Sequence, residues 1–345
     1  MPSDPNFWSF ASTFQRFLKH KLCLAENSSD PCNSPIVEAH TIPRSQLRKI
    51  AEGGHVYSFD NSLSQLERSG GKIAIKKFGV GQFSVLNCFC RRHDNEIFVD
   101  IEDGPLVFSP RQLALLHYRT VASELYRKLR MIEAINYQIG SYSKNQLDHE
   151  DREMLGDLEA FNEGHKLGMR DGRIAFSECE RILSEQDYSS LSALVVRFRR
   201  MPTIMTVGGF YPEFDFDGST LQNLGDQDQI YETISFNILA SEGRAAVAMI
   251  WRKGHDNPLN FAKSYERQPA HLYTTLAIQA SFEHLENTCV EQKWWDGLKR
   301  VEQDLLLRRM QIAGGIFEAR ENICLQYSGV THDDWGFDRL EYINV

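Results

Sequence analysis

The chain has 345 residues, of which 42% are hydrophobic and 25% charged, so a wholly disordered protein is excluded and two or three domains are expected. The net charge of -9 argues against a surface that attracts nucleic acid everywhere. Residues 1–110, however, carry 12 basic and 12 acidic side chains and can still present a basic face. With no apolar run of about 18 residues and no secretory signal, we expect a cytoplasmic protein whose seven cysteines are thiols or metal ligands.

The first hundred residues predict short elements separated by turns. Apolar spacing predicts an amphipathic helix over residues 6–21. The remaining elements are a strand over 36–43, helical turns over 44–52, strands over 55–60 and 72–78, and a strand within 83–98 that leads into a helix. A small domain of this kind buries few large apolar side chains, so it gains much from a metal clamp.

The middle of the chain predicts long helices. Ser109 is a suitable N-cap and Pro110 a suitable first helical residue for a helix that continues to about residue 140. A second helix is expected over 149–184, with Gly168 and Gly172 as points where it can break, and a third over 188–200. The two long helices form an antiparallel hairpin, and their polar faces offer a surface for a homo-oligomer.

The last third mixes strands and helices. Strands are expected within 203–218 and 232–251, the latter as a hairpin that turns at Ser241–Gly243. Helices are expected over 259–266, 273–287 and 291–312, followed by a polar tail over 325–345. We therefore predict an α+β protein of three regions: a zinc-binding module over 1–108, a long-helix region over 109–200, and an α+β region over 201–345.

Four N-terminal side chains form the strongest chemical pattern. Cys23 and Cys32 flank the loop before the first strand, and Cys90 and His93 form a C-x-x-H pair at the start of a helix. Two such pairs supply the tetrahedral set of soft ligands that a structural zinc ion needs. Cys88 can replace one cysteine, so the exact set stays open.

The order of these motifs resembles the HNH nucleases, the zinc-stapled branch of the ββα-metal fold. The resemblance covers about residues 20–105: a cysteine pair, a strand that ends in Ala39-His40-Thr-Ile-Pro, and the C-x-x-H pair followed by Asp94. It implies that His40 is the general base that activates water, and that Asp94 stands where the family has its last metal-binding histidine. It also implies that Cys23, Cys32, Cys90 and His93 hold the zinc ion, and that Mg²⁺ or Mn²⁺ serves catalysis.

The chain departs from the family pattern at two positions. Ala39 stands where a metal-binding aspartate or histidine is expected, and Glu38 points to the other face of the strand. The usual asparagine has no clear counterpart, and Ser84 is a polar substitute for it. Glu102 or Asp103, just past the helix, can complete a metal site or belong to a solvated acidic loop.

Basic residues near these motifs can form a rim that grips phosphates. They are Arg44, Arg48, Lys49, Lys76, Lys77, Arg91 and Arg92, and the alternative is that they lie on ordinary solvated faces. The partner we expect is nucleic acid, with DNA favoured and no membrane contact.

Three hypotheses follow. The first is a metal-dependent endonuclease of HNH type, in phage defence or a mobile element as the resemblance implies. The second is a catalytically silent zinc module that binds nucleic acid or protein, which Ala39 would explain. The third is a structural zinc head that serves a C-terminal site around Asp215 and Asp217.

Overall fold

The computed structural model describes residues 15–17, 19–25, 31–60, 65, 68–70, 72–142, 149–313 and 320–345. The chain divides into two compact units. The first comprises Met1–Ala39, Leu86–Glu96 and Val121–Glu178, and the second comprises His40–Val85, Ile97–Thr120 and Cys179–Val345. Most of the helix expected over residues 6–21 lies outside the described residues, although residues 15–17 are helical.

The first unit contains most of a two-stranded sheet and most of two long helices. Strands β1 (Ile36–His40) and β4 (Val85–Cys90) pair with each other, and α4 (Arg91–Glu102) begins at the residue after β4. This strand–strand–helix order is the one that the sequence predicted, although the two strands are separated in the chain by elements of the second unit.

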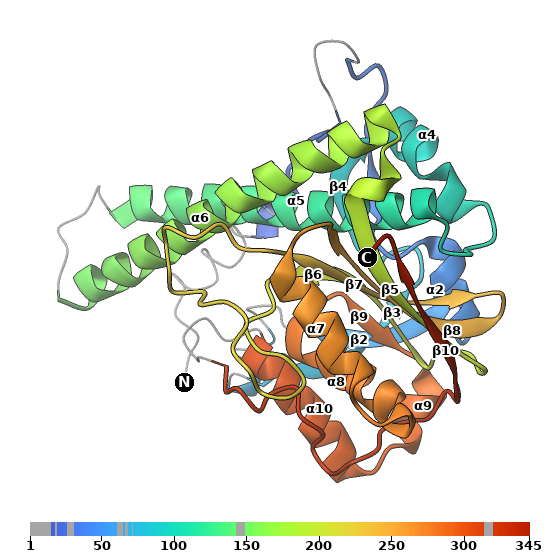
Figure 1. The fold of residues 1–345 in the computed structure, drawn as a ribbon. Helices are drawn as coiled ribbons and strands as arrows, with labels where there is room; N and C mark the ends of the chain where they lie inside the picture. The colour runs from blue at the N-terminus through green and yellow to red at the C-terminus, as the bar shows by residue number, and fades with distance from the viewer. Residues whose placement is uncertain are drawn as a thin grey trace. The chain divides into compact units, whose positions relative to one another are not determined.

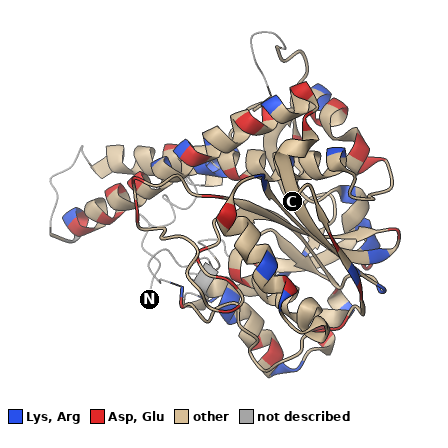
Figure 2. Cartoon of the chain, viewed as in Figure 1, with Lys and Arg blue, Asp and Glu red and all other residues tan. Residues whose placement is uncertain are grey.

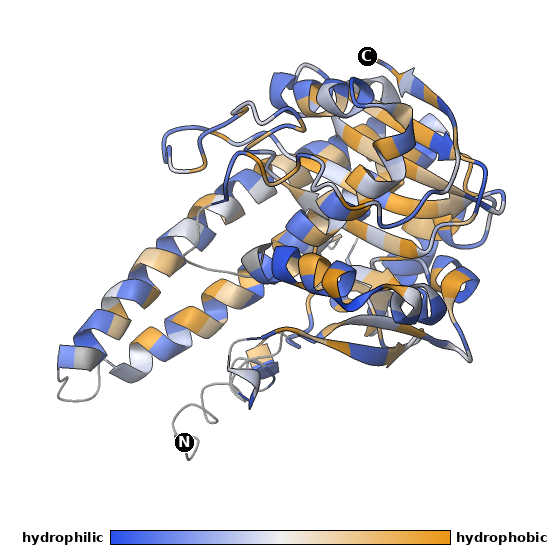
Figure 3. Cartoon of the chain, turned by 90° about the horizontal axis from the view of Figure 1, so that it is seen from below, coloured by the Kyte–Doolittle hydropathy of each residue, from blue (hydrophilic) through white to orange (hydrophobic). Residues whose placement is uncertain are grey.

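Helix α5 (Pro110–Tyr142) begins as predicted, because the backbone N–H of Gln112 donates to the Ser109 hydroxyl at 3.3 Å. Helix α6 (His149–Glu185) is continuous, so the glycines at 168 and 172 do not break it. They face α5 instead: a Cβ added at Gly168 would lie 2.8 Å from Nζ of Lys128, and one at Gly172 would lie 3.6 Å from a methyl carbon of Leu125. Both glycines thus lie at the contact between the two helices, whose outer halves run side by side in Figures 1 and 3.

The second unit is built on an eight-stranded sheet with the strand order β10-β5-β8-β7-β6-β9-β2-β3. Every neighbouring pair in this order is antiparallel. The strands are β2 (His55–Asp60), β3 (Ala74–Gly79), β5 (Leu191–Phe198), β6 (Ile204–Phe210), β7 (Ile234–Ser241), β8 (Arg244–Arg252), β9 (Thr288–Val290) and β10 (Phe337–Ile343).

The β7–β8 hairpin confirms the predicted turn. Ser241 pairs with Arg244, which leaves a two-residue loop of Glu242 and Gly243. Both loop residues have positive φ angles, 51° and 77°, as the tight turn of a right-twisted hairpin requires.

Both faces of the large sheet are covered. On β8, Val247, Met249 and Trp251 join a core with the helices of one face, whereas the alternating Ala246 and Ala248 are equally buried on the other face. The helices of the first face are α7 (Asp256–Glu266), α8 (Tyr273–His284) and α10 (Arg300–Ala313), which lie over the sheet in Figure 1, with the short α9 (Gln292–Gly297) nearby. Figure 2 shows the charges mainly on helices and loops, while the central strands are largely uncharged.

The other face contacts α2 (Arg44–Ile50) and the first turns of α5. The side-chain amide of Gln46 brackets the backbone of Ala240 on β7, donating to its carbonyl at 3.1 Å and accepting from its N–H at 2.9 Å. His117 of α5 lies 2.7 Å from the Ser235 hydroxyl, also on β7. These bonds fix α2, and with it the segment after His40, to the second unit.

Several sequence predictions for the second unit were wrong. Residues 188–200 are not a helix but a 3-10 turn, η1 (Tyr188–Ser190), followed by β5. Strand β5 lies between β8 and β10 with seven of its eight residues buried, so its apolar residues have no alternation that periodicity can detect. The expected polar tail contains β10, and the helix expected over 291–312 is interrupted between α9 and α10.

The chain is therefore a mixed α+β protein, as predicted at that level. The three-region division at residues 108 and 200 stays a prediction from the sequence. Within the described ranges, no helix is both long enough and apolar enough to cross a membrane.

Candidate metal centre and the surroundings of His40

The four predicted zinc ligands converge in the first unit. One ligand atom from each of Cys23, Cys32, Cys90 and His93 lies within 4.8 Å of all the others. Nδ1 of His93 is 3.2 Å from Sγ of Cys23 and 3.7 Å from Sγ of Cys32. Cys23, Cys90 and His93 are buried, and Cys32 is partly exposed. This Cys3His group is positioned to bind a metal ion.

Backbone hydrogen bonds bring these distant ligands together. The N–H groups of Leu22 and Leu24 donate to Asn87 and Cys88 of β4, both at 3.0 Å, and this places Cys23 beside the strand end. The N–H of Cys90 donates to Sγ of Cys23 at 3.2 Å. The site therefore needs the strand end, the helix start and the preceding loop together.

The Cys32 side of the centre is fixed by a second set of bonds. The N–H of Arg91 donates to the Pro35 carbonyl at 2.9 Å, and the N–H of Arg92 donates to the Ser34 hydroxyl at 2.9 Å. The loop that carries Cys32 is thus attached to the first turn of α4, from which His93 projects.

Arg92, which the sequence predicts to contact phosphates, lies beside the centre. Its Nη2 lies 2.6 Å from Nε2 of His93 and donates to the Pro31 carbonyl at 3.2 Å, while Nη1 pairs with Glu96 at 3.3 Å. When Nδ1 of His93 holds a cation, Nε2 carries the ring proton, and Arg92 then relies on Pro31 and Glu96. The guanidinium of Arg92 thus lies beside one ligand of the centre. No pattern in the sequence predicted this position.

The protonation of the thiols explains why the group suits a cation. Burial raises the pKa of Cys23 and of Cys32. Burial also acts to raise the pKa of Cys90, but hydrogen bonds from Ser34, the His93 backbone and the neighbouring thiols outweigh it and lower that pKa. Cys90 is therefore the most acidic thiol of the group, and a bound metal ion would stabilise the thiolate form of all three cysteines.

His40, the expected general base, lies in the second unit at the end of β1. Its Nε2–H donates to the Val80 carbonyl at 3.0 Å, so the neutral ring has its lone pair on Nδ1. Burial lowers the pKa of His40, and the positive charges of Arg44 and Arg119 add to this effect, while the Val80 bond and Glu102 oppose it. The lowered pKa favours the neutral ring, and the Val80 bond selects the tautomer that is protonated at Nε2.

Ser84 supports the segment that follows His40. Its hydroxyl accepts the N–H of Ile42 at 2.9 Å, and its carbonyl accepts the N–H of Thr41 at 2.7 Å. Its φ angle of 61° lies in the left-handed region, which costs energy for a residue with a side chain. Ser84 thus holds the backbone after His40.

The predicted acidic partners of His40 differ in their surroundings. Asp94 is in the first turn of α4, next to His93, and its Oδ1 is buried. His40 and Asp94 belong to different units, so the predicted pairing of the two stays a prediction. Glu102, in the same unit as His40, forms an ion pair with the buried Arg119. One of its oxygens is therefore already engaged.

Most of the predicted phosphate contacts are exposed, and several have intramolecular partners. Nζ of Lys49 donates to the Ala240 carbonyl at 3.3 Å, and Lys76 pairs with Asp60 at 3.2 Å. The exposed residues are Arg44, Arg48, Lys49, Lys76, Lys77 and Arg91. Arg44 differs from the others by its electrostatic effect on His40.

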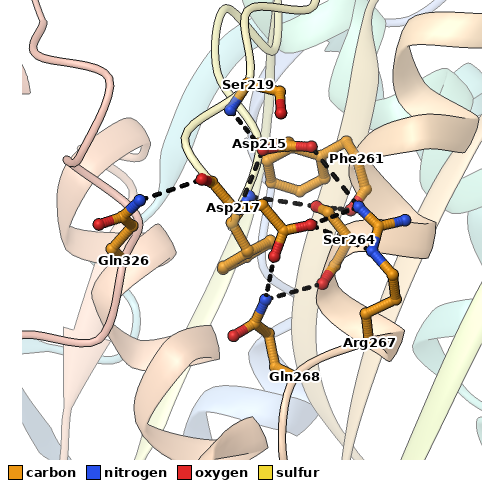
Figure 4. Close-up of polar contacts among 9 residues, drawn as sticks. Asp215, Asp217, Ser219, Phe261, Ser264, Arg267, Gln268 and Gln326 are labelled. Carbon is orange, nitrogen blue, oxygen red and sulfur yellow. Dashed lines mark hydrogen bonds and ion pairs between the residues drawn. The ribbon is translucent and has the colours of Figure 1, made fainter.

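The Asp215–Asp217 segment forms a structural turn (Figure 4). The buried Asp215 carboxylate accepts the N–H groups of Asp217 at 2.9 Å and of Ser219 at 2.8 Å. The Asp217 carboxylate pairs with Arg267 and accepts from Gln268 at 2.7 Å. Both carboxylates are therefore engaged in holding the turn against α7 and the residues after it.

Comparisons of the chain with protein-family models, with curated proteins and with solved structures found no match.

Proposed function

We propose that this chain is a metal-dependent endonuclease of HNH type, with His40 as general base and Asp94 helping to hold a divalent cation. The observation that carries the proposal is the Cys3His group, which joins the loop before β1 to the start of α4. In the ββα-metal fold a zinc ion occupies this place and staples the strand pair to the helix. Three thiolates and an imidazole also suit zinc better than a hard cation.

The surroundings of His40 support its role in the reaction. An attacking water donates its proton to Nδ1 while the Nε2–H stays bonded to the Val80 carbonyl. The resulting imidazolium is stabilised by the nearby charge of Glu102. The oxygen of that water bonds to phosphorus, and the bond from phosphorus to the leaving sugar oxygen breaks. A divalent cation, when bound, neutralises the charge that develops on the phosphate oxygens.

The proposal is tested by nicking of supercoiled plasmid DNA in Mg²⁺ or Mn²⁺. We expect His40→Ala to abolish nicking, while bound zinc and the circular dichroism spectrum stay unchanged. His55→Ala is the matched control, because His55 is a histidine of the same unit whose ring, among the residues that the structure describes, bonds only to the nearby Gly53 carbonyl, at 2.8 Å. Nicking that survives in His40→Ala would refute the assignment of the base.

A second candidate function is a catalytically silent zinc module that binds nucleic acid. Ala39 favours it, because this side chain offers no ligand and is only 4% exposed. The same plasmid distinguishes the two candidates. Retarded migration of the DNA without nicking in either cation, at protein concentrations that saturate binding, would favour the silent module.

The biological setting that we propose is phage defence or a mobile element, as the resemblance implies. The test is the plating efficiency of phages on cells that express the chain. Protection that is lost in His40→Ala supports the proposal, and equal plating with and without the chain refutes it.

A further inference from the structure

The loop between β3 and β4 contacts His40 and the two residues after it, and Arg44 of α2 lies beside the same loop. Val80 accepts from the imidazole, and Ser84 accepts the N–H groups of Thr41 and Ile42. The N–H groups of Gln82 and Phe83 both donate to the Gly79 carbonyl, at 2.8 and 3.1 Å, so the loop closes on itself. Residues 79–84 therefore form a hydrogen-bonded loop beside the proposed base.

The side chain of Arg44 lies beside this loop at Gly81. A Cβ added at Gly81 would lie 3.5 Å from Nη2 of Arg44 and 3.8 Å from Cζ, which is ordinary contact distance. The absence of a side chain at Gly81 therefore leaves the guanidinium uncovered on that side. Gly81 does not have a positive φ angle, so its backbone does not require glycine.

Arg44 is also an exposed positive charge that acts on His40. Arg119, the other arginine that acts on His40, is 3% exposed, pairs with Glu102, and stacks on the Phe98 ring at 4.0 Å. Arg44 is exposed and has no ion-pair partner among the described residues. A guanidinium offers a planar fork of donors that matches two phosphate oxygens.

We infer that Arg44 and the uncovered backbone at Gly81 form the subsite for the phosphate that is cleaved. This inference rests on the proposed function. It selects Arg44, from the seven basic residues of the predicted rim, as the one that contacts the cleaved phosphate. Arg44 donates to the non-bridging oxygens, on which negative charge increases as water attacks, and His40 takes the proton from that water. The ligand chemistry is a phosphodiester, of DNA or of RNA.

The kinetic test compares two arginines of α2. Arg44→Gln removes the proposed contact, and Arg48→Gln removes the same charge one helical turn further on, from another exposed side chain. Because loss of a donor aimed at developing charge costs roughly 10²-fold in kcat, we expect a fall of that size in Arg44→Gln at saturating plasmid. Arg48→Gln should change KM only. Equal kcat values for the two variants would overturn the inference.

A binding test keeps the inference falsifiable if the chain does not cleave. Labelled DNA and RNA duplexes of one sequence are titrated without added Mg²⁺ or Mn²⁺ and without chelator, so that a bound zinc ion stays in place. The logarithm of the binding constant falls as the logarithm of the salt concentration rises. Arg44→Gln should make this negative slope shallower by about 0.9, the value for one phosphate contact. Gly81→Val, which covers the guanidinium, should weaken binding similarly, whereas Gly79→Ala should not, because its Cβ would meet only Gln82, at 3.6 Å.

The outcomes separate the two claims. Binding that depends on Arg44 and Gly81, without cleavage, would refute the endonuclease and retain the subsite. Cleavage that changes at neither position would retain the endonuclease and refute the subsite. Failure to bind either duplex would refute both. The duplex that shows the larger effect of Arg44→Gln identifies the source of the phosphodiester.

Discussion

At the scale of single residues, the cost of burying three thiols and an imidazole in contact with each other must be offset. Cys90 is fully buried and Cys23 nearly so, and each sulfur has another ligand atom as its neighbour. A bound cation provides the compensation, because it attracts thiolates that burial alone would keep protonated. The centre should therefore contribute to folding as well as to local geometry.

The first prediction concerns which cysteine on β4 belongs to the centre. Cys90→Ser should lose bound zinc and lower the free energy of unfolding by several kcal/mol, because structural zinc binding is itself folding energy. Cys88→Ser should retain zinc, because Cys88 lies on the same strand but outside the group. Elemental analysis by mass spectrometry and urea unfolding measure both effects. Equal zinc contents in the two variants would contradict the assignment.

The second residue-scale prediction separates Arg92 from the nucleic-acid rim. Arg92→Ala should weaken zinc affinity about 10–100-fold, because with the metal bound Arg92 still joins the Pro31 carbonyl, next to Cys32, to Glu96 on α4. Arg91→Ala is the control, since Arg91 is exposed on the same turn. Competition with a chromophoric chelator measures the affinity. An Arg92→Ala protein with unchanged zinc affinity but a lower salt slope for DNA would restore the phosphate contact.

At the scale of elements, close approaches determine which glycines tolerate a side chain. In β6, a Cβ added at Gly208 would lie 2.6 Å from Cδ2 of Leu285, a residue that is 3% exposed at the end of α8. The leucine has little room to move, because it belongs to the core that α8 forms with the sheet. Gly208 is therefore required by packing rather than by its backbone angles.

The third prediction follows from this contact. Gly208→Ala should destabilise the protein by roughly 1–3 kcal/mol, the usual cost of an overpacked core. Gly164→Ala, on a part of α6 where an added Cβ meets nothing within 4 Å, should instead stabilise it by about 1 kcal/mol. A double-mutant cycle with Leu285→Ala, followed by urea unfolding, should show that the Gly208 and Leu285 effects are coupled. Additive effects would argue that the strand shifts to accept the methyl group.

The elements also show how far the sequence could predict this structure. Local signals sufficed for the start of α5, where Ser109 caps Pro110, and for the turn between β7 and β8. Elements defined by distant partners were missed. Strand β5 is buried on both sides, and β10 is a strand because it pairs with β5 from more than 130 residues away. No local pattern carries that information.

The same distinction applies to the sites. The four metal ligands were predicted because zinc limits both residue types and spacing. The contact of Arg92 with His93 and the bracing of the His40 segment by Ser84 depend on where loops fold. An arginine near a C-x-x-H motif, or a serine in a loop, is compatible with many roles. The contacts of Arg92 and Ser84 therefore became known only from the structure.

At the scale of the whole molecule, several histidines are buried in neutral form. Burial lowers the pKa of His117 to about 4, with a further contribution from His255. Burial likewise lowers the pKa of His332 to about 4, and the charge of Arg309 adds to it. His284 behaves in the same way. In the unfolded chain these rings titrate near pH 6.5.

The fourth prediction is therefore a loss of stability in mild acid. Between pH 6.5 and 4 these rings bind protons in the unfolded chain but stay neutral in the folded chain. The free energy of unfolding therefore decreases as the pH falls through this window. A shift of this size corresponds to up to about 3 kcal/mol for His117 at pH 4. Glu213 and Glu283, whose pKa values burial raises, act in the opposite direction with a smaller effect. Urea unfolding at pH 7, 6 and 5 measures the slope, and His117→Asn should reduce it relative to His55→Asn. Equal slopes for His117→Asn and His55→Asn would contradict the prediction that the buried His117 resists protonation in the folded chain.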